Sequence, residues 1–177
     1  TNENDEVPVY LKTGRYETII PSRNCISSAM NVGHPGNMAR IVTLYGGIMN
    51  ENGEILKSPD LKRMREDFYA VSITDDETRS TIEHCYKQFG LLLEPHGAVA
   101  WLGLQKYLNL DAGKKTGNVL CVSLETAHPA KFQEEITRIL NFTPPTPLSL
   151  SKVAEKTEEF LTLENNYDIF KNFILKN

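Results

Sequence analysis

The sequence contains little cysteine, no long apolar run and no excess of positive charge. Its three cysteines, Cys25, Cys85 and Cys121, are far apart and form no C-x-x-C pair, which argues against a disulfide framework or a zinc knuckle. The longest strongly apolar stretches, 90–93 and 119–124, are far shorter than the roughly 20 residues that cross a bilayer. The net charge of −4 mixes both signs along the chain, so nucleic acid and anionic membranes are poor candidate partners. We therefore expect a cytoplasmic protein with reduced thiols.

Signatures of common catalytic and metal sites are also missing. The four histidines show no H-x-x-x-H spacing, and there is no G-x-S-x-G turn around a serine nucleophile. We therefore expect neither a metal site nor a serine or cysteine nucleophile. Residues 1–6 do not resemble a signal peptide, and the chain begins without methionine, which we interpret as the start of a piece of a longer protein.

What the sequence does contain is 40% hydrophobic residues, enough for a packed core. Thr74 and Glu77 form a capping box ahead of an apolar stripe that ends at Gly90, which predicts a helix. Short apolar segments predict strands at residues 68–73, 91–93 and 119–124. The alternation of strands and helices predicts an α/β fold, with a mainly parallel sheet flanked by helices in three α/β/α layers.

Capping residues, prolines and helical spacing predict the remaining helices. They cover residues 5–13, 35–45, 59–66, 95–108, 129–140, 151–163 and 167–175. The run Thr-Pro-Pro-Thr-Pro predicts a stiff linker at 143–148. We expect the linker to separate a main domain, 1–142, from C-terminal helices in 149–177.

Polar residues gather at three points where a helix is about to begin, residues 27–40, 93–97 and 125–131. The first is a small, glycine-containing loop that leads into a helix, where free N–H groups and Arg40 suit a phosphate or carboxylate. An ordinary helix start with a solvated arginine explains the same residues. From the residues alone, both interpretations stay open.

The other two junctions carry acid–base groups. Glu94 and His96 follow a predicted strand, where Glu94 suits ring orientation or proton transfer and His96 suits acid–base work. The simpler alternative is that Glu94 caps the helix and His96 is a hydrogen-bonded structural histidine. At 125–131 a hydroxyl, an imidazole and an ammonium group lie within six residues, more than capping requires.

The residues at these junctions resemble those of one enzyme family. Residues 126–132 read T-A-H-P-A-K-F, a motif of threonine synthases of the longer-chain branch found in bacteria and fungi. Residues 28–37 with Arg40 are similar to the family's N-A-M-D-V-G-x-P-S-N-x-x-R stretch, and 93–99 contains its P-H-x-A-V segment. The opening residues, 1–8, resemble a T-N-x-N-D-x-V-P run that lies well inside the full enzyme. The resemblance therefore points to the C-terminal portion of a threonine synthase.

The chain also departs from the family pattern. The family's Asn, Asp and Ser in the first motif are here Ser28, Asn31 and Gly36. No lysine stands in the family's nucleophile setting, and no Gly-Asn-x-Gly loop is present to hold the cofactor phosphate. Both lie upstream of the T-N-x-N run in the family. We therefore expect no catalytic residue in this chain, with the Schiff-base lysine supplied from upstream.

The resemblance implies a pyridoxal 5'-phosphate enzyme of fold type II. The implied reaction converts O-phospho-L-homoserine and water to L-threonine and phosphate. The implied cofactor contacts are Thr126, Glu94 and His128. Of these, Thr126 would face the pyridine nitrogen. The implied substrate contacts are Ser28, Asn31, Asn37, Arg40 and Lys131. The expected partners are this small substrate and the missing N-terminal part of the same chain, with no nucleic acid, membrane or metal.

Two alternatives remain at this stage. The E-P-x-G-A run at 94–98 also resembles pyridoxal-phosphate dehydratases, so another lyase of the same fold type is possible. The motif at 126–132 and the loop at 28–37 disfavour that reading. The other alternative is a catalytically dead scaffold domain, which the upstream sequence distinguishes. A lysine after an S-F-K-D-like run and a Gly-Asn-x-Gly loop would indicate an enzyme.

Overall fold

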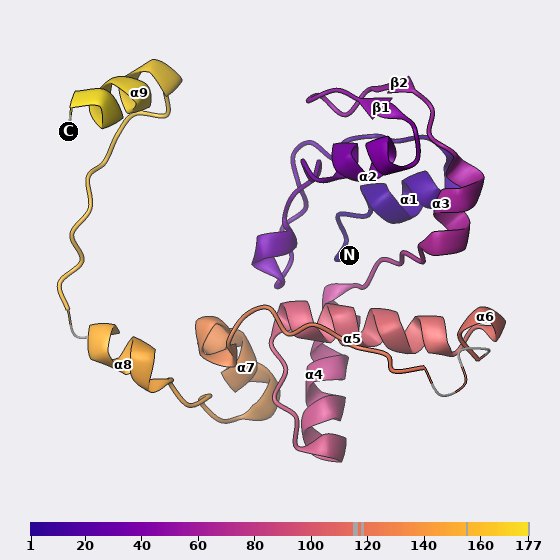
Figure 1. Cartoon of the computed structure of the whole chain (residues 1–177). Coiled ribbons are helices and arrows are strands. Elements are labelled where there is room, and N and C mark those ends of the chain that lie inside the picture. The colour runs from indigo at the N-terminus through magenta and orange to yellow at the C-terminus, as the bar shows by residue number, and fades with distance from the viewer. Residues whose placement is uncertain (115–116, 118, 155, 177) are drawn as a thin grey trace. The chain divides into compact units, whose positions relative to one another are not determined.

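The structure is a computed structural model that describes residues 1–114, 117, 119–154 and 156–176 (Figure 1). The chain divides into two compact units, Thr1–Pro144 and Pro145–Asn177. The first unit contains every residue predicted to bind cofactor or substrate. No described helix is long and apolar enough to cross a membrane.

The first half of the larger unit is a small helical layer with one hairpin. Its elements are α1 (Glu6–Thr13), η1 (Ser28–Met30), α2 (Met38–Leu44), β1 (Ile48–Met49), β2 (Ile55–Lys57) and α3 (Leu61–Asp67). The strands β1 and β2 pair antiparallel. Apolar side chains from α1, α2, β1 and α3 form its core: Tyr10, Leu11, Met38, Val42, Met49 and Met64.

The second half is built from helices that pack around α5. Its elements are α4 (Asp75–Phe89), α5 (Pro95–Leu108), α6 (Asp111–Lys114), η2 (Pro129–Phe132) and α7 (Gln133–Leu140). Their core consists of Ile82, Cys85, Leu93, Ala98 and Ile136.

The smaller unit carries α8 (Leu148–Ala154) and α9 (Tyr167–Lys176). Residues 156–163 are not helical, so the predicted helix at 151–163 is wrong over that part.

Helix α4 begins and ends as the sequence predicts. Thr74 Oγ1 accepts from the Glu77 backbone N–H at 3.2 Å, and the Glu77 carboxylate accepts from the Thr74 N–H at 2.9 Å. Gly90 ends the helix with φ of +64°, a conformation that glycine adopts without steric cost. Because every contact in these caps is local, the sequence pattern alone was sufficient to predict this helix.

The predicted strands are not formed as strands in the part of the chain that the structure describes. Residues 68–73, 91–93 and 119–124 are assigned to no strand, and the sheet found among the described residues is the antiparallel β1–β2 pair. The predicted three-layer α/β/α fold is therefore not established by a sheet within the described residues. A strand needs a hydrogen-bonding neighbour, and a sequence pattern does not say whether the neighbour lies in the same piece of chain.

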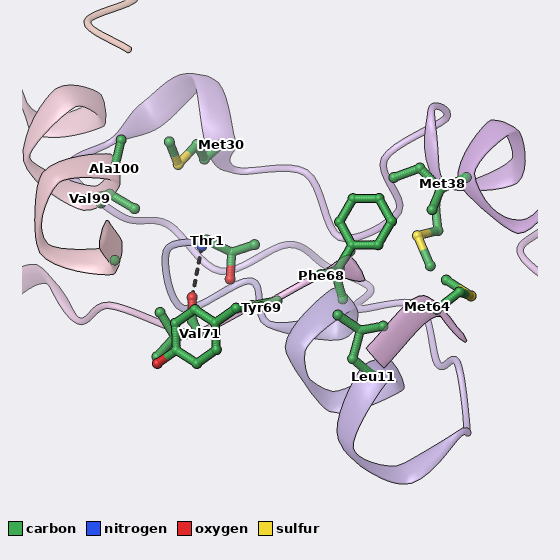
Figure 2. A pocket seen from close by; sticks show the side chains of 14 residues that line it. Thr1, Leu11, Met30, Met38, Met64, Phe68, Tyr69, Val71, Val99 and Ala100 are labelled. Carbon is green, nitrogen blue, oxygen red and sulfur yellow. Dashed lines mark hydrogen bonds between the residues drawn. The ribbon is translucent and has the colours of Figure 1, made fainter. Parts of the chain in front are cut away.

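One pairing nevertheless has the parallel pattern. The Thr1 nitrogen donates to Val71 O at 2.9 Å (Figure 2). The Ile73 N–H donates to Thr1 O at 2.9 Å, so Thr1 bonds to the residues on either side of Ser72. Bonds that slant from one residue to two alternate residues are typical of a parallel ladder. The segment 71–73 therefore lies beside Thr1 as a parallel strand would.

Candidate active site

The loop at residues 23–31 is held by two buried asparagine amides. Asn2 and Asn4 are only 1% and 2% exposed. Asn2 Nδ2 donates to Ser27 Oγ and to Asn31 Oδ1, both at 3.1 Å. Asn4 Nδ2 donates to Arg23 O at 3.0 Å, and the Arg23 N–H donates back to Asn4 Oδ1 at 2.8 Å. The opening Asn-x-Asn run therefore shapes the loop that contains two of the predicted substrate contacts, Ser28 and Asn31.

Asn31 is turned into this loop. Its Oδ1 accepts from Asn2 Nδ2 and from the Cys25 N–H, and its Nδ2 donates to Asn24 Oδ1 and to Cys25 O. Both ends of the amide are thus bonded inside the protein. Ser28, by contrast, is exposed at the start of η1. The geometry gives Asn31 a role in holding the loop and leaves the Ser28 hydroxyl exposed on its surface.

A carboxylate at the start of α4 fixes the same loop from another side. The Ile26 N–H donates to both carboxylate oxygens of Asp75, at 3.1 and 3.3 Å. Cys25 Sγ lies 3.8 Å from a Glu3 carboxylate oxygen, and burial raises the pKa of the Cys25 thiol, with both acids adding to the effect. The thiol therefore stays protonated, and the acids serve as hydrogen-bond acceptors.

The second junction joins this loop to α5. Glu94 is fully buried and caps α5, since its carboxylate accepts from the N–H groups of His96 and Gly97, each at 2.9 Å. The same carboxylate lies 2.5 Å from His96 Nδ1. The other ring nitrogen, Nε2, accepts from the Ala29 N–H at 3.0 Å. Glu94 is therefore engaged within the protein, as both a helix cap and the partner of His96.

The third junction contacts the second through Glu125. Its carboxylate accepts from the Glu94 N–H at 3.1 Å. A Cβ at Gly97 would collide with this carboxylate, so a larger residue there would push the Glu125 side chain aside. Partial burial raises the pKa of Glu125, and the nearby Glu94 charge adds to the rise, while the Glu94 N–H bond opposes it. Phe132 completes the contact, because its ring centre lies 5.1 Å from that of His96.

The predicted cofactor contacts Thr126 and His128 and the predicted substrate contact Lys131 face outward at this junction. Thr126, His128 and Lys131 are all exposed. His128 caps η2, with Nδ1 accepting from the Ala130 N–H at 3.1 Å, and that leaves Nε2 to carry the ring proton of the neutral form. Within the described residues, the Thr126 hydroxyl has no hydrogen-bond partner. These side chains therefore present a hydroxyl, an N–H and an ammonium group to a ligand.

Asn37 and Arg40 lie apart from this network. Both are exposed at the start of α2, which begins at Met38 and is shorter than the predicted 35–45. Asn37 provides the cap position, although its side chain makes no capping bond. Within the described residues, no hydrogen bond or ion pair joins either side chain to the other predicted contacts. The structure leaves both free to meet an anion.

A separate apolar cavity of about 380 Å³ lies near Thr1. Figure 2 shows Met30 with Val99 and Ala100 on one side of it, and Met38, Met64 and Phe68 on the other. No lysine or arginine side chain lines it, nor does any predicted contact residue. A cavity without fixed cations does not suit a phosphorylated ligand, so the candidate site remains at the three junctions.

Sequence comparison relates the chain to one enzyme family. The family profile described as "Threonine synthase, C-terminal" matches residues 102–174. The threonine synthase of Haemophilus influenzae is 33% identical over 178 residues, which cover 99% of this chain and 36% of the relative.

Solved structures agree as well. The crystal structure of threonine synthase from Escherichia coli matches with a TM-score of 0.77 and 26% identity, over 99% of this chain and 36% of that chain. The structure of "PLP bound Threonine synthase" from Brucella melitensis matches with a TM-score of 0.78 and 27% identity, over 98% and 38%. The chain belongs to the threonine synthase family. It corresponds to the C-terminal region and spans little more than a third of the length of these relatives.

The family similarity and the site geometry complement each other. The motifs shared with threonine synthases predicted Glu94, Thr126 and His128 as cofactor contacts. Asn2, Asn4 and Glu125 were not predicted as site residues, although Asn2 and Asn4 lie in the T-N-x-N-D run that carried the resemblance. That run could have indicated the buried amides, because two asparagine side chains separated by one residue are unusual as buried groups.

Proposed function

We propose that the full-length protein is a pyridoxal-phosphate-dependent threonine synthase that converts O-phospho-L-homoserine and water to L-threonine and phosphate. The carrying observation is the match of essentially the whole chain to a PLP-bound threonine synthase, in sequence and in fold. The chain lacks a lysine in the expected setting, so it supplies one side of the site and the upstream chain supplies the lysine. The scattered cysteines, all free in this structure, support a cytoplasmic location.

The residues at the third junction fit a role beside the cofactor. Pyridoxal phosphate supplies an electron-withdrawing ring that stabilises negative charge when protons leave the substrate. Thr126 offers an exposed, unpartnered hydroxyl that suits the pyridine nitrogen, and a neutral hydroxyl leaves that nitrogen largely unprotonated. His128 offers its Nε2–H nearby. Glu94 acts one step back, because its carboxylate caps α5 and holds His96.

The substrate side is supplied by exposed polar and cationic groups. Arg40 offers a planar fork for a phosphate or a carboxylate, and Asn37 offers an amide next to it. Lys131 adds a mobile positive charge, and Ser28 a hydroxyl on a fixed loop. Asn31 contributes by holding that loop. A substrate with a phosphate and a carboxylate needs such separated cations to be held in one orientation.

The upstream chain also completes the fold in this proposal. The parallel pairing of Thr1 with 71–73 would extend along the residues before Thr1. Exposed apolar side chains at 119–124, including Leu120 at 85% and Leu124 at 69%, need cover from another part of the protein. We propose that 68–73, 91–93 and 119–124 become strands of a mainly parallel sheet with helices on both faces. Residues 1–142 then belong to the catalytic domain, 143–148 form the linker, and 149–177 carry the C-terminal helices.

The test uses the full-length protein loaded with pyridoxal phosphate. Release of phosphate from O-phospho-L-homoserine with equal formation of threonine supports the proposal. Arg40→Lys should lower kcat/KM by roughly five- to 150-fold, corresponding to about 1–3 kcal/mol for a charge-assisted pair, without weakening cofactor binding. Arg63→Lys is the matched control, because Arg63 is exposed on α3 and pairs with Asp67. It should leave the kinetics unchanged.

Other outcomes identify the alternatives. Deamination of serine or threonine, without threonine formation from the phosphorylated substrate, would indicate a dehydratase of the same fold type. Absence of both reactions in a protein that has bound the cofactor would indicate a scaffold. Equal kinetics of the Arg40→Lys and Arg63→Lys proteins would return Arg40 to the role of a solvated helix residue.

A further inference from the structure

His96 is buried between the loop at 23–31 and the third junction. It is 4% exposed, and its ring contacts three parts of the chain. Nδ1 lies 2.5 Å from the Glu94 carboxylate, Nε2 accepts from the Ala29 N–H at 3.0 Å, and the ring centre lies 5.1 Å from that of Phe132. The alternatives for this histidine at the level of sequence were acid–base chemistry and a structural hydrogen bond.

The hydrogen bonds determine which ring nitrogen carries the proton. A backbone N–H only donates, so the Ala29 N–H requires an unprotonated Nε2. The proton of the neutral ring therefore resides on Nδ1, where it is donated to Glu94. Because both nitrogens are engaged and the ring is buried, His96 has no position from which to transfer a proton to a ligand. Its contacts fit a residue that positions other groups.

The group that it positions is the η1 turn. Ala29 follows Ser28, and the buried Asn2 amide ties both ends of the turn by donating to Ser27 Oγ and to Asn31 Oδ1. The Asn4 amide adds a bond to Met30 O. Those amides come from the chain before the loop, whereas His96 comes from α5. We propose that His96 is a positioning residue for the loop at 23–31, which is the substrate loop of the proposed function. The unprotonated Nε2 of His96 holds the Ala29 N–H and thereby fixes the place of Ser28.

This inference rests on the proposed function, because the loop is a substrate loop only in that function. The positioning role predicts an effect on substrate binding. Ser28 presents its hydroxyl from a turn with one fixed orientation, and loss of the Ala29 bond would let the turn rotate away. The substrate would then bind less tightly, while the rate of the bound substrate would change little.

Two substitutions separate the two ends of the ring. The side-chain nitrogen of Asn lies close to where Nδ1 is, so His96→Asn retains the donor to Glu94 and removes the acceptor for Ala29. The side-chain oxygen of Gln reaches close to where Nε2 is, so His96→Gln retains the acceptor for Ala29. Both variants are made in the full-length enzyme loaded with cofactor, and circular dichroism confirms that each is folded.

The first measurement is amide hydrogen exchange in peptides that cover 27–33, which does not depend on the reaction. In His96→Asn, exchange at Ala29 should be about three- to tenfold faster than in the parent, whereas His96→Gln should stay within about twofold. The second measurement is steady-state kinetics. KM for O-phospho-L-homoserine should rise about three- to tenfold in His96→Asn with kcat nearly constant, and His96→Gln should stay close to the parent.

The proposal would be overturned if both variants kept the exchange rate and the KM of the parent. It would also be overturned if His96→Gln raised the exchange rate and KM as much as His96→Asn does. A parent enzyme that forms no threonine would overturn the proposed function, and the exchange measurement would still decide whether His96 fixes the turn. The parent also gives a test without substitution. Its His96 Nε2 should show the ¹⁵N shift of an unprotonated ring nitrogen, and a protonated Nε2 would overturn the proposal.

Discussion

In the proposed site, the loop at 23–31 lies on the substrate side and the segment at 119–127 lies on the cofactor side. The two regions differ in how many of their contacts are made within this chain. In the loop, the side-chain amides of Asn2, Asn4 and Asn31 are bonded within the protein. In the other segment, Val122 and Leu124 are 65% and 69% exposed, and the described residues form no strand there. The contacts of the loop are therefore made within this chain, whereas in the proposed function the segment at 119–127 would be covered by upstream chain.

The largest effect is expected at the buried amides of the substrate side. Asn2→Ala should lower the free energy of unfolding of the full-length protein by about 2–3 kcal/mol, because it leaves the Asn4 N–H and its loop partners unpaired. KM for the substrate should rise, while cofactor affinity should stay constant. Denaturant unfolding and a cofactor titration measure the two quantities.

Asn24→Ala is the control for this prediction. Asn24 is exposed, accepts one bond from Asn31 Nδ2, and should change the free energy of unfolding by less than about 0.5 kcal/mol. If Asn2→Ala weakened cofactor binding as much as substrate binding, the two sides would not be separable, and the comparison would fail.

An intermediate effect is expected where the two sides touch. Gly97→Ala should lower the free energy of unfolding by about 1–3 kcal/mol, because the new methyl group would displace the Glu125 carboxylate from the Glu94 N–H. In Gly97→Ala/Glu125→Ala the collision is removed, so the double variant should be more stable than the sum of the single changes predicts. A double-mutant cycle by denaturant unfolding measures the difference. Strict additivity would contradict the contact.

The smallest effect is expected from the charge of Glu125. Its pKa is raised from 4.5, mainly by desolvation, so the folded state holds the proton more tightly than the unfolded state. The resulting loss of stability is absent below pH 4.5 and develops as pH rises through the higher, folded pKa. Glu125→Gln retains an oxygen for the Glu94 N–H and should remove this loss, raising stability at pH 7 by at most about 1 kcal/mol after solvent screening.

The measurement for Glu125 is the free energy of unfolding between pH 4 and pH 8. The variant and the parent should coincide at the acid end and diverge toward neutral pH, with the variant more stable. Divergence in the opposite direction would mean that the carboxylate is stabilised in the full-length protein. That result would indicate that upstream cations cover the cofactor side.

The sequence predicted what depends on local contacts. Helix α4 was predicted because Thr74, Glu77 and Gly90 carry its caps within a few residues, and the capping role of Glu94 was one of two open alternatives. The amide network was not predicted as such, because Asn2 bonds to partners 25 and 29 residues away. No local pattern encodes which loop a buried amide will meet. The strands stay a prediction for a related reason, since a strand pattern does not say which segment will be its hydrogen-bonding neighbour.

The parallel contact of Thr1 with Val71 has a consequence for how the protein is made. The two residues are 70 positions apart, so at roughly 5–20 residues per second a ribosome needs roughly 4–14 s to add the second after the first. During that interval, Thr1 lacks the neighbour that bonds it here, and an unpaired strand edge is a site of aggregation. Slow codons between Thr1 and Val71 would lengthen the interval. We therefore expect translation speed across this stretch to affect the yield of the full-length protein.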